Sequence, residues 1–232
     1  MDQICFILVE PQVPQNVGAA ARALKTMGFT DLRLVDSRVH HEEPARWLAH
    51  GAAEILNQII VFDTLKDAVR DCDFCVGTTA RFRNRRKDYH SPQALLEIIR
   101  NKGQAVRRVA VIFGREESGL TNEEIDLCDI ISTIPMKTAF PSLNLAQAVM
   151  IYAYVLSCLP PQDNSKFKFR KNEHSQQTIL KQKIMELSEI LGLSEKKSFY
   201  TRLLERSSLL RDFDMRLVHT IIEKIRDRIT SL

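Results

Sequence analysis

VAVIFGREESGL, residues 109–120, joins five apolar residues to a charged segment that contains two glycines. Residues 109–113 have the composition of a strand that is buried on both faces, as the strands of a parallel sheet are. The charged segment begins at Gly114 and turns again at Gly119, and glycine permits backbone conformations that other residues avoid. The stretch therefore predicts a buried parallel strand that ends in a sharply turning, charged loop.

Similar strand-like runs recur along the first 160 residues and alternate with helical patterns. The predicted strands are 4–9, 32–35, 59–62, 74–76, 109–113 and 130–134. The predicted helices are 16–27, 43–50, 65–70, 92–101, 121–128 and 143–159. Helix 143–159 is apolar nearly all round, which predicts burial on more than one side. The alternation predicts an α/β domain with a mostly parallel sheet covered on both faces.

The composition is that of a globular, cytoplasmic protein. Hydrophobic residues make up 44% and charged residues 27% of the 232 residues, both ordinary values. The N-terminus lacks the basic and apolar regions of a signal peptide, and no run reaches the roughly 20 apolar residues of a membrane span. Cys72 and Cys75 have metal-ligand spacing, but they lie in a strand-like run without a second ligand pair. We expect no metal site.

Charge divides the chain unevenly. Residues 1–163 contain 18 Lys and Arg against 20 Asp and Glu, whereas residues 164–232 contain 15 against 9, a net charge of +6. Pro160 and Pro161 end the last helical pattern of the first part. We predict a domain over 1–160, a basic linker over 161–173, and a helical C-terminal extension over 174–232 with helices near 175–191, 195–210 and 214–229.

Four loops at predicted strand ends are rich in functional residue types, and ligands of open parallel sheets bind at the carboxyl ends of strands. In loop 11–22, Asn16 could cap a helix, and Arg22 is either functional or part of a surface salt bridge. Loop 77–87 carries five cations within seven positions. Such a loop is either a phosphate-binding segment or simply solvated.

The remaining two loops are 113–120 and 134–145. Their glycines permit close approach of the backbone to a ligand, while Ser142 could simply be an N-cap. The glycine-rich fingerprints of dinucleotide and P-loop sites are absent, as is the G-x-S-x-G motif of hydrolases. Pattern alone therefore predicts a ligand site at the strand ends and basic segments for nucleic acid, but no particular reaction.

Three ordered motifs carry a family resemblance: Asn16-x5-Arg22, the FGRE-x2-GLTNEE stretch at 113–124, and Ile134-Pro-x6-Ser-Leu-Asn-Leu at 134–145. Together they strongly resemble the signature motifs of the SpoU (TrmH) branch of SPOUT RNA methyltransferases. The sequence AARALKTMG at 20–28 is most similar to the TrmJ/LasT group of that branch. The resemblance covers roughly residues 3–158.

The resemblance implies a six-stranded parallel sheet whose C-terminal part forms a deep trefoil knot, although knots are nearly absent from proteins in general. It also implies a homodimer and S-adenosylmethionine as cofactor, held mostly by backbone groups. The implied cofactor contacts are Thr78, Thr79, Ala80, Gly114, Ile134, Pro141, Ser142 and Leu143.

The same resemblance implies a catalytic group. It consists of Arg22 with Asn16, Glu116, Ser142 and Asn144. The expected reaction is methyl transfer to a ribose 2′-OH. Two roles are open for Arg22: a proton acceptor, or a cation that stabilises the developing alkoxide. The second is favoured because a guanidinium group holds its proton above pH 12.

The substrate implied by the resemblance is tRNA, at the ribose of an anticodon-loop nucleotide such as position 32. Ribosomal or other RNA is the alternative target, and RNA binding without turnover and base methylation are alternative functions. By charge rather than by motif, we expect phosphate contacts from Arg81, Arg83, Arg85, Arg86, Lys168, Arg170 and Lys171.

Overall fold

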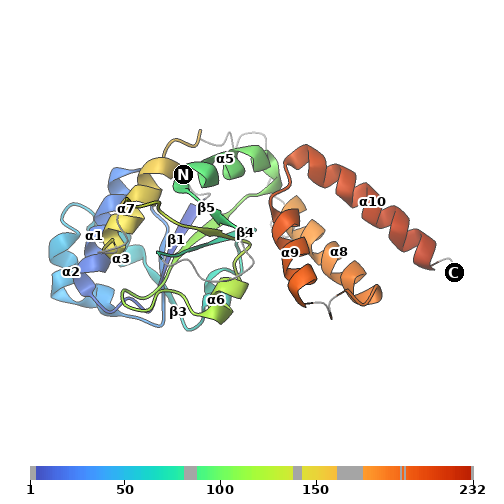
Figure 1. The fold of residues 1–232 in the computed structure, drawn as a ribbon. Helices are drawn as coiled ribbons and strands as arrows, with labels where there is room; N and C mark the ends of the chain where they lie inside the picture. The colour runs from blue at the N-terminus through green and yellow to red at the C-terminus, as the bar shows by residue number, and fades with distance from the viewer. Residues whose placement is uncertain are drawn as a thin grey trace.

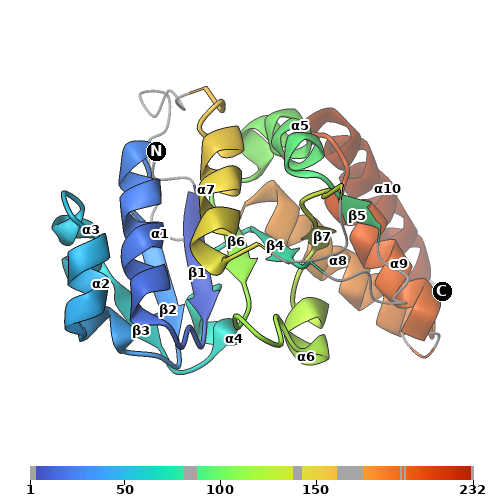
Figure 2. The same ribbon diagram turned by 60° about the vertical axis from the view of Figure 1, so that its left-hand side comes forward.

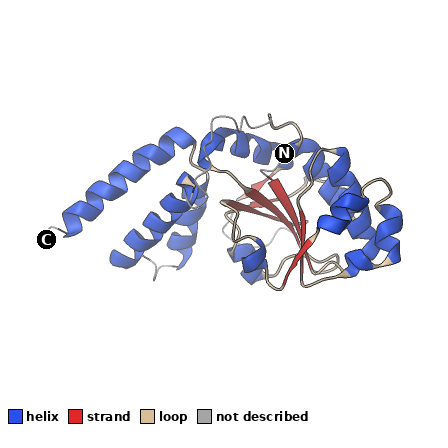
Figure 3. Ribbon diagram, turned by 180° about the vertical axis from the view of Figure 1, so that it is seen from behind, coloured by secondary structure: helices blue, strands red, loops and turns tan. Residues whose placement is uncertain are grey.

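The protein is an α/β domain followed by three helices, as the computed structural model shows (Figure 1). The structure describes residues 4–80, 88–137, 143–160, 175–193, 195 and 197–230. In these ranges, no helix is long and apolar enough to cross a membrane. A parallel sheet forms the centre of the domain and lies between two layers of helices (Figure 3).

The sheet has seven strands in the order β3-β2-β1-β6-β4-β7-β5. The strands are β1 (Ile4–Val9), β2 (Leu32–Val35), β3 (Ile60–Phe62), β4 (Phe74–Thr78), β5 (Tyr89–His90), β6 (Val109–Phe113) and β7 (Ile130–Ser132). All their pairings are parallel. The predicted six-stranded sheet was therefore wrong by one strand. The two residues of β5 were missed because so short an edge strand has no alternation to detect.

Register aligns the apolar residues into rows across the sheet. Phe6 lies opposite Val111, which lies opposite Val76. These side chains belong to the larger of the two cores, whereas their neighbours in sequence, such as Ile7 and Ile112, belong to the core on the other face. Both faces of the central strands are thus buried, as the continuous apolar run at 109–113 predicted.

The larger core is covered by α1 (Pro14–Thr26), α2 (Glu43–Leu48), α3 (Ala53–Gln58), α5 (Pro92–Lys102) and α7 (Leu145–Leu156). Gly18 lets α1 and α2 approach closely, since a Cβ at this position would overlap the backbone of Ala45. Gly28 follows α1 with a φ of 80°, the left-handed conformation in which a glycine commonly ends a helix, as the sequence predicts. Helix α3 was not predicted.

The other face is covered by α4 (Leu65–Ala68) and α6 (Asn122–Asp126). Helix α6 begins with the capping box expected from its sequence. The Thr121 hydroxyl accepts from the Glu124 amide, and the Glu124 carboxylate accepts from the Thr121 amide. This arrangement fixes the end of the charged loop that follows β6.

Helix α7 lies beside α1 on the larger core (Figure 2). Its N-cap is Asn144, whose side chain accepts from the Ala146 amide, in a capping box with Gln147. One side of α7 is exposed, because 37% of Met150 and 63% of Tyr154 are accessible. The rest of α7 packs against α1, α5 and the larger core, so the predicted burial on more than one side is confirmed, although the helix is not buried all round.

Helices α8 (Gln176–Ile190), α9 (Lys197–Ser208) and α10 (Asp212–Thr230) form the C-terminal part. They share a small core with Ala105 of the 3₁₀ turn η2 (Gly103–Ala105). Polar contacts add to it: Lys181 pairs with Asp129 at 2.8 Å, and the Thr178 hydroxyl donates to Asp73 at 3.2 Å. Both acids directly precede strands, so the three helices bind at the amino edge of the sheet.

Candidate functional site

Three loops meet at the carboxyl edge of the sheet and bring Asn16, Glu116 and Asn144 together. The Asn16 amide donates to Glu116 at 2.9 Å, and the Asn144 amide donates to the Asn16 oxygen at 2.7 Å. The two bonded pairs are 100 and 128 positions apart in the sequence, so only the fold joins them. Asn16 is 6% exposed, and its amide orientation is fixed by its two partners.

The Glu116 carboxylate is held by three donors from the segment after β1. Besides Asn16, the main-chain amides of Gln12 and Val13 donate to it at 3.1 and 3.3 Å. The sequence suggested that Asn16 could cap α1, but it does not. The helix begins after Val13 with Pro14 in its first turn, and no side chain caps it. The amide of Asn16 is instead used to join α1 to the loop after β6.

Arg115 binds the same two loops together from the other side. Its guanidinium group forms an ion pair with Glu10 and donates two hydrogen bonds of 3.1 Å to Glu124. Hydrogen bonding to Arg115 lowers the pKa of Glu10 below its ordinary value. Glu10 has a φ of 44°, in the left-handed region, at the point where β1 ends. Sequence reasoning missed Glu10; its signal would have been a charge directly after a buried strand.

The glycines of the charged loop have a structural reason for being there. A Cβ at Gly114 would overlap the backbone of Gly119 and Leu120, so the loop closes on Gly114 itself. Arg115 and Gly119 exchange main-chain hydrogen bonds at 2.9 and 3.3 Å, and Gly119 has a φ of 71°. Gly114 thus permits a tight turn, and its expected contact with a cofactor stays a prediction.

The other expected cofactor residues surround the ends of β4 and β7. The Thr78 hydroxyl donates to the Ile112 carbonyl at 2.9 Å, and the Thr79 amide donates to the Ser132 carbonyl at 3.0 Å. The main-chain groups of half-buried Ile134 bond to no other described residue. Exposed Ala80 is next to Thr79, and half-buried Leu143 precedes the N-cap of α7.

A donor set of this kind suits a ligand that is recognised by backbone groups. Ile134 offers both an amide and a carbonyl at the carboxyl edge, where ligands of parallel sheets bind. Because Ile134 is partly exposed, its amide and carbonyl can bond to water or to a ligand. The residues present therefore fit an adenosine-bearing cofactor.

Arg22 does not contact the Asn16, Glu116 and Asn144 group in the single chain. It lies six residues beyond Asn16, which places it about 9 Å further along the helix and on a different side. Its side chain is exposed and pairs with no carboxylate among the described residues. The salt bridge considered as an alternative from the sequence is not formed within the described chain.

Several predicted residues fall outside the ranges that the structure describes. They are Arg81, Arg83, Arg85, Arg86, Pro141, Ser142, Lys168, Arg170 and Lys171. The expected roles of these residues in binding RNA, cofactor or substrate stay predictions.

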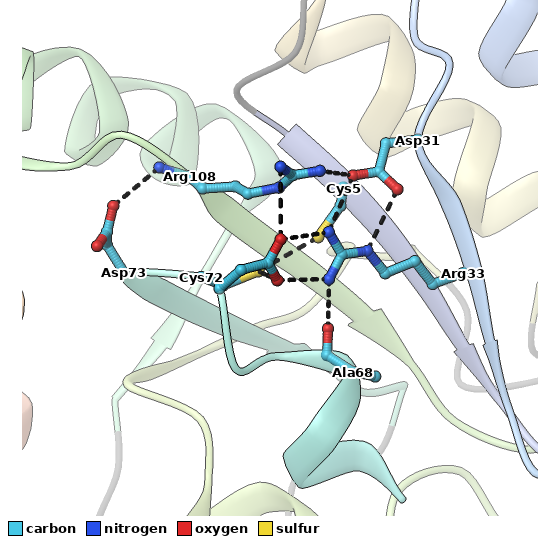
Figure 4. A network of polar contacts seen from close by, with 8 residues as sticks. Cys5, Asp31, Arg33, Ala68, Cys72, Asp73 and Arg108 are labelled. Atoms are coloured by element: carbon cyan, nitrogen blue, oxygen red, sulfur yellow. Dashed lines mark hydrogen bonds and ion pairs between the residues drawn. The ribbon is translucent and has the colours of Figure 1, made fainter. Parts of the chain in front are cut away.

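A second polar network lies at the opposite, amino edge of the sheet (Figure 4). Buried Arg33 donates two hydrogen bonds to Asp71, at 2.6 and 2.8 Å, and another to the Ala68 carbonyl. Asp31 pairs with both Arg33 and Arg108. Each charged group of this network faces an opposite charge, so removing one partner would leave a buried charge unpaired and destabilise the domain.

The thiols beside this network are also structural. Cys5 and Cys72 lie with their sulfur atoms 3.4 Å apart, and burial raises the pKa of Cys75 well above its ordinary value. A thiol with a raised pKa is a poor nucleophile and metal ligand. Cys75 is buried in β4, as the sequence predicted, whereas Cys72 precedes the strand.

Comparisons with known proteins identify relatives along the whole chain. The sequence profile of the SpoU rRNA Methylase family matches residues 3–154, and that of the C-terminal domain of the tRNA/rRNA methyltransferase LasT matches residues 174–229. The chain is 42% identical over 229 residues to a protein of Escherichia coli K12 described as an uncharacterized tRNA/rRNA methyltransferase LasT, covering 99% of this chain and all of that protein.

A second relative has a named reaction. The tRNA (cytidine/uridine-2′-O-)-methyltransferase TrmJ of Yersinia pestis is 39% identical over 159 residues, which cover 66% of this chain and 60% of that enzyme. The crystal structure of TrmJ from Z. mobilis matches with a TM-score of 0.66 at 29% identity, over 96% of this chain and 98% of that one.

A more distant structure shares the fold alone. The SpoU methyltransferase AviRb from Streptomyces viridochromogenes, in complex with the cofactor AdoMet, matches with a TM-score of 0.52 at 18% identity. It covers 67% of this chain and 60% of that one.

Proposed function

Because the chain belongs to the SpoU rRNA methylase family, we propose that it transfers the methyl group of S-adenosylmethionine to a ribose 2′-hydroxyl of tRNA, in the anticodon loop. The observation that carries the proposal is the group of Asn16, Glu116 and Asn144, which three separate loops assemble at the carboxyl edge of the sheet. The named reaction of the TrmJ relative supports the choice of a ribose oxygen.

We assign the cofactor to the region between the carboxyl ends of β4, β6 and β7. Thr79, Ala80, Gly114, Ile134 and Leu143 would hold it through main-chain groups, with Pro141 and Ser142 beside them in the sequence. When bound, S-adenosylmethionine supplies an electrophilic methyl group on a sulfonium. The chain supplies the groups that surround the donor and the hydrogen bonds that orient it. AdoMet in the AviRb complex supports this class of cofactor.

Asn16, Glu116 and Asn144 would position the substrate. Glu116 already accepts three hydrogen bonds, so in this proposal it orders the loops and does not take the hydroxyl proton. Exposed Asn144 presents an amide group that can hold a ribose hydroxyl in one orientation, and buried Asn16 fixes the position of Asn144. Ser142 would lie near the transferred methyl group.

Arg22 would act as a cation on the 2′-oxygen and the adjoining phosphate, in the site of a second copy of the chain. Its exposed side chain and its distance from Asn16 support a role across subunits. The exposed sides of α1 and α7 form one surface that includes Met150 and Tyr154. We propose this surface as the homodimer interface.

The proposal includes a knot in the chain after β7. Two connections would form it: residues 79–88, between β4 and β5, and residues 133–144, between β7 and α7. In the sheet, β7 lies between β4 and β5. We propose that the second passes through the loop formed by the first. An experimental structure in which it passes outside that loop would exclude the knot.

The test uses the purified full chain, labelled S-adenosylmethionine and a total tRNA preparation, followed by nucleoside analysis. The expected product is a 2′-O-methylated nucleoside, and the Arg22→Ala variant should lose at least roughly a hundredfold in rate, as groups that stabilise a developing oxyanion typically do. A methylated base in the product would contradict the ribose assignment. An unchanged rate in the variant would remove Arg22 from the mechanism. Light scattering of Tyr154→Asp tests the dimer, which should dissociate.

A further inference from the structure

A cavity of about 350 Å³ lies at the β3 edge of the domain, apart from the site described above. Its polar lining consists of Arg38, His40, His41, Arg46 and Asn57, and its remaining lining is apolar, from α3, β3 and the residue before β3. The residues come from the turn η1 (Val39–His41) and the neighbouring helices α2 and α3, which lie next to β3 at one side of the domain (Figure 2).

The cavity is basic and its positive charge is not compensated. Arg38 and Arg46 are exposed, and neither pairs with a carboxylate in the described part of the chain. No acid is among the residues that line the cavity. Some other cations of the domain do pair with acids, as Arg33 and Arg115 do. Two arginines without partners around one hollow favour an anionic ligand, because the guanidinium fork matches phosphate oxygens.

His40 adds an independent observation. It is 4% exposed, and its Nδ1 has no hydrogen-bond partner among the described residues. Burial lowers the pKa of His40, and the nearby His41 and Arg38 lower it further. Burial and the positive neighbours both disfavour the charged ring, and a bound anion would oppose the effect of the neighbours. A buried polar group without a partner costs free energy unless a ligand or water satisfies it.

The segment that leads to the cavity residues touches the loops that carry the proposed methyl-transfer site. The Ser37 hydroxyl donates to the Pro11 carbonyl at 2.8 Å, so the residue before Arg38 touches the segment after β1. The next residues of that segment, Gln12 and Val13, donate to Glu116. One continuous set of loops therefore joins the cavity to the site.

We propose that this cavity binds a phosphate group of the RNA substrate, next to the nucleotide that is methylated. The proposal rests on the proposed function, because it takes the ligand to be RNA. A single strand that enters the site carries a phosphate at every nucleotide, and each cation that neutralises one releases a condensed counterion. The apolar part of the lining can face the sugar or base of the same nucleotide. Arg38 and Arg46 would bind the phosphate, and Asn57 would donate to it.

The test compares the double variant Arg38→Ala/Arg46→Ala with a matched control, Lys66→Ala/Arg70→Ala. The control also removes two positive charges from exposed side chains, but on and after α4, which covers the opposite face of the sheet. Affinity for total tRNA is measured by filter binding across a salt series. We expect the cavity variant to bind roughly tenfold more weakly and its salt slope to fall by roughly 0.7 to 0.9, the value for one lost phosphate contact. The control should change far less.

A second measurement uses inorganic phosphate as probe. The ring signals of His40 and His41 in NMR spectra should shift with phosphate in the wild type and stay unchanged in the cavity variant. Equal loss of tRNA affinity in the two double variants would overturn the proposal. Shifts with phosphate but unchanged tRNA binding would also overturn it, in favour of a site for free anions. If the wild type transferred no methyl group, the proposed function would fail while the binding comparison still decided the cavity.

Discussion

Exchanging Glu116 for Gln tests whether this carboxylate orders the site. The change keeps the size of the side chain and removes one oxygen and the charge. Glu116 accepts from Asn16 and Val13 through one oxygen, at 2.9 and 3.3 Å, and from Gln12 through the other, at 3.1 Å. In its best orientation a glutamine keeps the first oxygen and turns its amide group toward the Gln12 amide, where two donors face each other.

The expected cost follows from this geometry. A hydrogen bond to a charged group contributes about 1.5 to 3 kcal/mol, and a neutral one about 1 kcal/mol. The variant loses one charge-assisted bond outright and weakens two others. Because Glu116 is only half-buried, water replaces part of the loss. We expect a decrease of about 2 to 3 kcal/mol in the free energy of unfolding, which for a chain of this size lowers Tm by about 5 to 10 °C.

The measurement is urea unfolding, with Glu189→Gln as control because it removes the same charge from an exposed residue of α8. The control should stay within about 0.5 kcal/mol of the wild type. Methyl transfer to tRNA by Glu116→Gln should fall at least roughly tenfold in kcat/KM, since small displacements of a positioned substrate are costly. A variant as stable and as active as the wild type would show that the three hydrogen bonds do not order the loops.

Three further predictions concern the framework. Arg33→Met should cost about 3 kcal/mol, since it leaves the buried Ala68 carbonyl without its donor. Burial acts to raise the pKa of Asp71, but hydrogen bonding to Arg33 outweighs it and the net shift is downward. The Asp71–Arg33 pair therefore loses its contribution to stability as the pH falls below about 4. In urea unfolding, the free energies of unfolding of Arg33→Met and wild type should approach each other there. Gly18→Ala should lower stability by about 1 to 3 kcal/mol in thermal unfolding, because the new Cβ would overlap the backbone of Ala45 in α2. Burial lowers the pKa of Lys102 to about 8, so the unfolded chain binds more protons than the folded chain between pH 8 and 10.5. The free energy of unfolding of the wild type should therefore rise with pH in this range, by up to about 1.4 kcal/mol per pH unit from this group. Lys102→Met should lack this rise.

Much of the sheet could be predicted because its strands are buried on both faces. Ile4–Val9, Leu32–Val35 and Val109–Phe113 were predicted residue for residue, since a continuous apolar run between polar segments has few other readings. Two elements were missed for different reasons: the strand Tyr89–His90 and the helix Ala53–Gln58. The strand is too short to show a period, and the helix begins without a capping side chain.

The site could be predicted only in part. The motifs indicated that Asn16, Glu116 and Asn144 belong to one place, and the structure brings them together. Their partners could not be predicted, because a hydrogen bond between loops over a hundred residues apart leaves no local signal. The same limit applies to the partners of Glu10 and to the set of residues that line the cavity around Arg38. Each joins residues that no spacing rule connects.

The position of the C-terminal helices limits what their positive charge can do. Arg202 and Arg206 pair with Asp88, and Lys181 pairs with Asp129. These cations are neutralised by acids at the amino edge of the sheet, whereas Asn16 and Glu116 lie at the carboxyl edge. Within one chain, therefore, the charge excess of the C-terminal region is partly used to attach it to the first domain. Among the described residues, we therefore expect RNA at the proposed site of the same chain to be bound mainly by cations of the first domain, such as those around the β3-edge cavity.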